Sequence, residues 1–177
     1  MVSTCLPIPH PIPSHIMATA SAIPETPALT PLQIADLHHR AECVARNAHA
    51  PYSNFRVGAA ILLAPDSAAN ILPDTILTGC NVENASYRLT TCAEQSAIAA
   101  AVALYGSALR LRAVVIVNLN GSPCSPCGAC RQTVLEFSTP ATQVFFPGPD
   151  GSTIQTSITE LLPHAFQADS LPPSNQP

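Results

Sequence analysis

Three cysteines and a glutamate are spaced as a hydrolytic metal site would require. Cys92 and Glu94 lie two residues apart at the expected start of one helix, and Cys127 and Cys130 lie at the expected start of another. Cysteines at i and i+3 can direct both sulfurs to one ion, and a sulfur from a neighbouring helix start gives a third corner of a tetrahedron. Because an open fourth corner is typical of catalytic zinc, the pattern predicts one catalytic Zn²⁺ per chain.

Glu94 is the candidate acid–base group of this site. A carboxylate beside an open metal corner can take a proton from water and deliver it to a substrate. Zinc deaminases carry a ligand-x-Glu motif followed later by Pro-Cys-x-x-Cys, and this chain has Cys92-Ala93-Glu94 and then Pro126 to Cys130. A structural alternative is that Glu94 closes a capping box with Thr91.

Composition excludes several other classes of function. The 177 residues suit about one domain, and only 10% are charged, against about 25% in a typical protein. The chain contains no lysine and has a formal net charge of −4, which argues against a nucleic-acid binder and a polybasic membrane anchor. No apolar stretch approaches the roughly 18 residues of a membrane span. Seven cysteines, an odd number, favour a reducing compartment, and we expect a cytoplasmic protein.

Proline-rich ends flank one expected domain. Residues 1–29 carry alternating prolines and predict an extended tail, in which Met17 is a possible natural start. Residues 171–177 predict a second, shorter tail. The domain itself is expected to span residues 30–170.

Helices and strands alternate through this domain. We expect strands at 56–64, 75–83, 111–117, 143–146 and 152–156, and helices at 30–48, 92–105, 127–137 and 158–162. This order predicts an α/β domain with its sheet between helices. Because the strand-helix-strand units from the second to the fourth strand are expected to run parallel, two helix starts with their cysteines meet at one sheet edge.

The chain resembles the small, all-cysteine cytidine deaminases of pyrimidine salvage over roughly residues 30–170. The resemblance rests on four motifs in order: Pro51 to Phe55 with Val57 to Ala60, Gly79 to Tyr87, Cys92 to Glu94, and Ser125 to Gln132. It implies a three-layer α-β-α sandwich with a mixed sheet of about five strands. It also implies a hydrolase that converts cytidine and deoxycytidine to uridine and deoxyuridine with release of ammonia. The family further implies a homotetramer whose active sites are shared between subunits.

The resemblance assigns a role to each matching position. Zinc would be bound by Cys92, Cys127 and Cys130, with Glu94 as the proton carrier. The ring of Phe55 would stack on the pyrimidine, and Asn81 and Glu83 would hold the ribose hydroxyls. Tyr87 and Phe166 would reach the pocket of an adjacent subunit. The remaining substrate-binding positions would be Ala85 and Ala93. Ordinary core packing remains the alternative for the aromatic residues, and a solvated edge strand remains the alternative for Asn81 and Glu83.

Other interpretations stay open at this point. Cys124 also fits a Pro-Cys-x-x-Cys motif, and as a fourth ligand it would make the site a structural zinc module. Gln95 stands where many relatives carry arginine, so we hypothesise that Arg131 and the helix ends offset the charge of three thiolates. A deaminase of cytosine-containing antibiotic nucleosides is the nearest rival activity. The preference between cytidine and deoxycytidine is left undecided.

An apolar helix explains the low charge. The expected helix at 92–105 is apolar on every side from Ala97 to Leu104, which the surface of a monomer would not tolerate. Together with the low content of charged residues, this predicts that copies of the chain cover part of one another, as in the tetramer that the resemblance implies.

Overall fold

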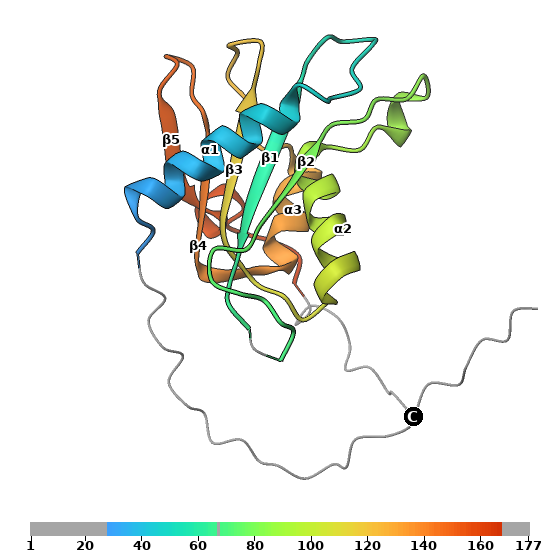
Figure 1. Cartoon of the computed structure of the whole chain (residues 1–177). Helices are drawn as coiled ribbons and strands as arrows, with labels where there is room; N and C mark the ends of the chain where they lie inside the picture. Colours follow the sequence, from blue (N-terminus) through green and yellow to red (C-terminus); the bar gives the residue numbers. More distant parts are fainter. Residues whose placement is uncertain (1–27, 67, 168–177) are drawn as a thin grey trace, which may run out of the picture.

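The computed structural model describes residues 28–66 and 68–167, and Figure 1 shows their arrangement. The helices are α1 (Pro31–Ala45), α2 (Ala93–Tyr105), α3 (Gly128–Glu136) and α4 (Ile158–Leu161), with a 3-10 turn η1 (Tyr87–Leu89). The strands are β1 (Val57–Leu63), β2 (Ile76–Cys80), β3 (Leu111–Asn118), β4 (Ser138–Pro147) and β5 (Thr153–Ser157). The predicted tails fall mostly on residues 1–27 and 168–177, with Met17 among them, which lie outside the described residues.

Helix α1 begins at the predicted capping box. The Thr30 hydroxyl accepts from the Gln33 backbone N–H at 3.2 Å, and the Gln33 side-chain oxygen accepts from the Thr30 N–H at 2.9 Å. Pro31 occupies the first helical position, where its missing N–H has no intrahelical partner to lose. The helix ends at Ala45, three residues before the predicted end at 48.

The five strands form one mixed sheet in the order β2-β1-β3-β4-β5. β1 runs antiparallel to both of its neighbours, β3 and β4 are parallel, and β5 is antiparallel to β4. β2 and β3 therefore point in the same direction on either side of β1. As predicted, α2 and α3 both begin beyond the carboxyl ends of strands at one edge of the sheet.

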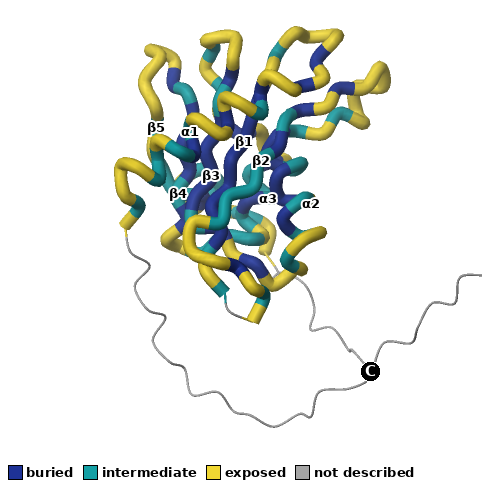
Figure 2. Tube along the Cα trace, in the orientation of Figure 1, coloured by how far each residue is buried: buried dark blue, intermediate teal, exposed yellow. Residues whose placement is uncertain are grey.

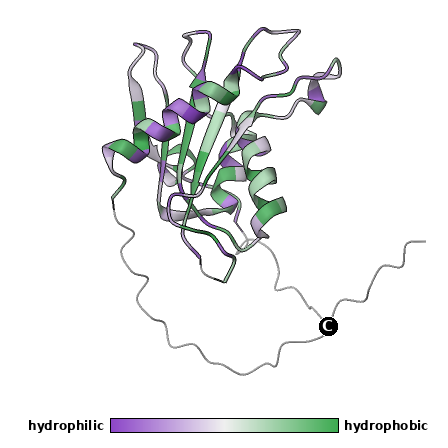
Figure 3. Cartoon of the chain, viewed as in Figure 1, coloured by the Kyte–Doolittle hydropathy of each residue, from purple (hydrophilic) through white to green (hydrophobic). Residues whose placement is uncertain are grey.

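Helices cover both faces of the sheet and confirm the three-layer sandwich. α1 packs Leu37 and Ala41 on a face that includes Leu62, Val115 and Phe145, while α2, α3 and α4 cover the other face. Every residue of β1 is buried, which Figure 2 shows as an unbroken buried strand. In Figure 3 the central strands are hydrophobic along their length, whereas α1 presents hydrophilic residues outward. Among the described residues, no helix combines the length and the hydropathy that a membrane span requires.

Two strands differ from their predicted bounds by several residues. The strand predicted over 75–83 ends at Cys80, and residues 81–92 form an arm with η1 at its tip (Figure 1). The base of this arm stays extended because Val82 bridges to His49 and Thr91. β4 begins at Ser138 rather than 143, since pairing of Ser138 with Leu111 extends the strand through Pro140 and Ala141, which are residues of low strand propensity.

Gly79 is where β2 meets α2, and we expect Gly79→Ala to destabilise the domain. A Cβ at this position would lie 2.3 Å from the backbone nitrogen of Ala97 and 2.6 Å from the carbonyl oxygen of Ala93. Because neither backbone atom can rotate away, we expect a loss of about 2–3 kcal/mol in the free energy of unfolding, measured by urea denaturation. Gly128→Ala is the matched control, because a Cβ there meets no atom within 4 Å. Equal stability of the two variants would contradict this packing.

Candidate active site

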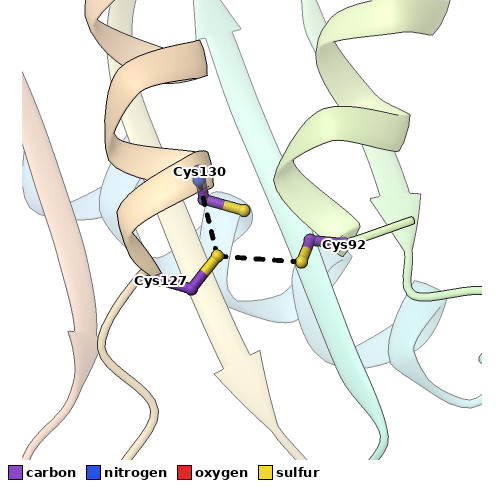
Figure 4. Close-up of side chains that lie close together, drawn as sticks. All are labelled: Cys92, Cys127 and Cys130. Atoms are coloured by element: carbon purple, nitrogen blue, oxygen red, sulfur yellow. Dashed lines mark hydrogen bonds between the residues drawn. The ribbon is translucent and has the colours of Figure 1, made fainter. Parts of the chain in front are cut away.

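Three sulfur atoms meet where α2 and α3 begin. Cys92 is the N-cap residue of α2, Cys127 is the N-cap residue of α3, and Cys130 lies in the first turn of α3 (Figure 4). The Sγ atoms of Cys92 and Cys127 are 3.9 Å apart, and all three Sγ atoms lie within 4.8 Å of one another. The starts of two helices therefore supply the whole cluster.

The cluster fits a zinc ion. Zinc–sulfur bonds of about 2.3 Å in a tetrahedron place sulfurs about 3.8 Å apart, close to the Cys92–Cys127 separation. The start of α3 also stabilises negative sulfur, because the Cys130 backbone N–H donates to the Cys127 Sγ at 3.5 Å. Three thiolate ligands leave one corner of the tetrahedron for a small molecule, which is the arrangement of a catalytic site.

The sulfurs perturb one another strongly. A hydrogen bond from the Cys130 thiol lowers the pKa of Cys92 to about 7, and the same bond, together with burial, raises the pKa of Cys130. Cys124 behaves differently, since burial raises the pKa of its thiol to about 11. Its sulfur lies outside the three-atom cluster, although the residue lines the cavity beside it.

Glu94 lies at the second position of α2, with its side chain buried. The predicted alternative, a capping box between Thr91 and Glu94, is wrong because the helix is capped one residue later. Cys92 is the N-cap, and its backbone N–H donates to the Gln95 side-chain oxygen at 3.4 Å. Gln95 therefore does the capping, and Glu94, only 4% exposed, lines the cavity with the three cysteines. Burial raises the pKa of Glu94.

A cavity of about 240 Å³ opens on the sulfur cluster and Glu94. Four of the predicted substrate-binding residues line it: Phe55, Asn81, Glu83 and Ala93. The other three, Ala85, Tyr87 and Phe166, lie outside the cavity of the single chain and are exposed. The Tyr87 ring packs beside the Tyr52 ring with centroids 6.2 Å apart. A single chain thus assembles the metal and polar parts of the site but leaves the aromatic residues of the arm and the C-terminal segment outside it.

Asn81 holds the strand that carries Phe55. Its side-chain oxygen accepts from the Val57 backbone N–H and its side-chain nitrogen donates to the Phe55 carbonyl, both at 2.9 Å. An amide nitrogen has two N–H donors, and the bond to the Phe55 carbonyl uses one of them. Asn81 therefore fixes the backbone on both sides of Arg56 and so positions Phe55.

Glu83 is fixed by the turn that contains Ser53, a residue of the Pro51 to Phe55 motif to which the sequence assigned no role. Its carboxylate accepts from the backbone N–H groups of Tyr52 and Ser53, at 3.0 and 3.3 Å, and from the Ser53 hydroxyl. The hydroxyl bond from Ser53 is the main cause that lowers the pKa of Glu83. The Ser53 oxygen also accepts from the Phe55 N–H at 2.9 Å, so one serine orients two cavity residues. A serine whose hydroxyl accepts from the backbone N–H two residues later is typical of turns, so Ser53 after Pro51 could have indicated this turn from the sequence.

Arg131 contacts backbone and serine oxygens. Its guanidinium donates to the carbonyls of Pro126 and Leu161, both at 2.9 Å, and to the Ser125 hydroxyl at 2.8 Å. These bonds join the loop before Cys127 to the end of α4. Arg131 therefore fixes the loop that carries Cys127, while its role in offsetting thiolate charge stays a hypothesis.

Comparison with known proteins places the chain in a family. The model of the cytidine and deoxycytidylate deaminase zinc-binding region matches residues 32–146. A cytidine deaminase of Sporosarcina psychrophila is 40% identical over 124 residues, covering 70% of this chain and 84% of the relative. The crystal structure of cytidine deaminase from Burkholderia pseudomallei aligns with a TM-score of 0.64 and 38% identity over 75% of this chain and 98% of that one. The corresponding structure from Mycobacterium tuberculosis aligns with a TM-score of 0.62 and 36% identity over 76% and 97%. With a matching family model, a matching fold and a three-sulfur cluster within the matched residues, the chain belongs to the cytidine and deoxycytidylate deaminase family.

Proposed function

We propose that the protein is a zinc-dependent hydrolase of pyrimidine salvage that deaminates cytidine and deoxycytidine to uridine and deoxyuridine with release of ammonia. The observation that carries this proposal is the buried Glu94 carboxylate in one cavity with a three-sulfur cluster. A structural zinc module would not need that carboxylate, and Cys124 does not join the cluster as a fourth ligand. A thiol redox protein would leave Cys92 without a purpose.

The residues of the cavity divide the chemistry between them. Cys92, Cys127 and Cys130 would hold the zinc, which when bound supplies Lewis acidity that makes water nucleophilic at neutral pH. Glu94 accepts a proton from water and delivers it to the pyrimidine ring nitrogen, and it then takes the proton of the hydroxyl added at C4 and delivers that one to the leaving amine. Its burial keeps bulk water from competing for that proton. Attack at C4 of cytosine and loss of ammonia complete the reaction.

Substrate binding follows from the groups that line the cavity. Phe55 stacks on the pyrimidine, while Asn81 and Glu83 hold the ribose hydroxyls with one free N–H and an ionised carboxylate. Ala93 lines the base end, and Ala85, Tyr87 and Phe166 complete the pocket from the subunit interface. The support is that Phe55, Asn81, Glu83 and Ala93 share one cavity and that Glu83 is held ionised by the Ser53 turn.

A substrate panel tests the assignment. Zinc-loaded protein is incubated with cytidine, deoxycytidine, cytidine monophosphate or adenosine, and the ultraviolet absorbance of each is followed. We expect loss of the cytosine absorbance with the two nucleosides and none with adenosine or the nucleotide. Turnover of adenosine, or no turnover of any substrate by protein with zinc bound, would contradict the proposal.

Oligomeric state and location are part of the same proposal. Several large apolar side chains are more than 60% exposed on the described surface, and Tyr87, Leu89, Leu104 and Phe166 are among them. The outer face of α2 also exposes Ala99 and Ala103, while Ala97 and Ala101 are buried in the core. We infer a homotetramer in which these surfaces meet and in which Tyr87 and Phe166 enter the cavities of neighbouring subunits. We also infer that the catalytic domain spans residues 30–170. The odd number of cysteines suits a cytoplasmic location.

Sedimentation analysis at micromolar concentration checks the oligomer. A tetramer of an 18.5 kDa chain is the expected species. A monomer that is fully active would contradict the shared active site and leave the low charge of the chain unexplained.

A further inference from the structure

The hydroxyl of Thr90 is a shielded polar group without a hydrogen-bond partner among the described residues. Its oxygen is buried from solvent, although the residue lines the active-site cavity. The backbone N–H of Thr90 does have a partner, since it donates to the Tyr87 carbonyl at 3.0 Å. A buried hydroxyl without a partner costs about 1–3 kcal/mol, so its presence in a native fold requires an explanation.

Backbone pairing places Thr90 opposite Glu83. Val82 and Thr91 exchange both of their backbone hydrogen bonds, at 2.9 and 3.0 Å. In an antiparallel pair the next two residues, here Glu83 and Thr90, face each other without hydrogen bonds and bring their side chains closer on one side. Val82 and Thr91 are exposed, whereas Glu83 is buried and Thr90 half-buried. Both members of the inner pair line the same cavity.

Glu83 does not satisfy this hydroxyl. The carboxylate is already bound by the backbone N–H groups of Tyr52 and Ser53 and by the Ser53 hydroxyl. Thr90 is absent from that set of donors, although it is the cross-strand neighbour. Its hydroxyl can both donate and accept, and rotation about one side-chain bond changes its direction. A ligand that brings its own hydroxyl groups next to Glu83 would supply the missing partner.

We propose that Thr90 determines substrate specificity by hydrogen-bonding the 2′- or 3′-hydroxyl of the bound nucleoside. The proposal rests on the proposed function, in which Glu83 is the residue at the ribose end of the cavity. Thr90 then adds a neutral contact beside a charged one, and it discriminates between nucleosides that carry and lack the contacted hydroxyl. The discrimination is effective because the Thr90 hydroxyl would stay unpaired when the bound nucleoside lacks that hydroxyl.

Thr90→Val replaces the hydroxyl with a methyl group of similar size and tests the contact. kcat/KM is measured with cytidine, 2′-deoxycytidine and 3′-deoxycytidine for wild type and variant. We expect the variant to lose about 3- to 10-fold in kcat/KM on cytidine, through KM, as for one hydrogen bond. The loss should vanish for the one deoxynucleoside that lacks the contacted hydroxyl, which identifies that hydroxyl as 2′ or 3′.

Two further variants and one physical measurement complete the test. Thr90→Ser keeps the hydroxyl and should retain wild-type discrimination, and Thr91→Val, at the exposed neighbouring position, should leave all three substrates unchanged. The melting temperature of ligand-free Thr90→Val should equal or exceed that of wild type, because an unpaired buried hydroxyl has been removed.

Two results would overturn the assignment in different ways. Equal losses on all three nucleosides, or no loss on any, with an active wild type would overturn the role of Thr90 alone. A zinc-loaded wild type without activity on cytidine would overturn the proposed function together with this assignment.

Discussion

Glu94→Gln is expected to lower kcat for cytidine by about 10²- to 10⁴-fold while the protein still binds one zinc ion per chain. Glutamine fills the same space in the buried start of α2 but cannot accept a proton from water or return it to the leaving amine. Gln95 caps the helix, so the substitution leaves the helix start intact. Zinc content and kcat are measured on the same preparation.

The control for this prediction is a second glutamate, Glu136, which lies outside the cavity. Glu136→Gln changes an exposed residue at the end of α3 and should leave both kcat and zinc content unchanged. If Glu94→Gln kept wild-type kcat, the proton carrier would have to be another group, and the central role of Glu94 would be wrong.

Replacing any one of Cys92, Cys127 and Cys130 by serine is expected to reduce bound zinc from one per chain to near zero and to abolish activity. Serine is a much poorer zinc ligand than a thiolate, and two remaining sulfurs cannot complete the site. Zinc is measured after dialysis against a weak chelator. Circular dichroism separates loss of the ion from loss of the fold.

Cys124→Ser is the matched control, because Cys124 lines the same cavity but its sulfur lies outside the three-atom cluster. This variant should keep its zinc. The opposite pattern, in which Cys124→Ser loses zinc and Cys130→Ser retains it, would show that the ligand set is shifted by three residues.

Local spacing accounts for most of what the sequence predicted correctly. The sulfurs of Cys127 and Cys130 lie close together because i and i+3 side chains share the first turn of a helix, and this holds in any fold. The alternation of Asn81 and Glu83 also survived, although β2 ends at Cys80, since the bridges of Val82 keep the backbone extended. The order of helices and strands along the chain also predicted that α2 and α3 begin at one edge of the sheet.

The features that the sequence did not predict depend on tertiary contacts or on a choice between near neighbours. Thr91 and Cys92 are both possible caps, and packing of α2 selected Cys92, which changed the interpretation of Glu94. Ser53 acts on Glu83 thirty residues away, a pairing that no local pattern encodes. β4 includes residues 138–142 because Ser138 pairs with Leu111 of β3 and the Thr142 hydroxyl donates to the Leu111 carbonyl.

Hydrolysis in ¹⁸O-enriched water tests the central claim most directly. Zinc-loaded protein is incubated with cytidine, and the products are analysed by mass spectrometry together with an assay for ammonia. We predict uridine that carries one ¹⁸O atom at C4 and one ammonia per uridine, because the attacking oxygen comes from water. Absence of uridine, or uridine without the label, would contradict hydrolytic deamination at the site formed by Glu94 and the three cysteines.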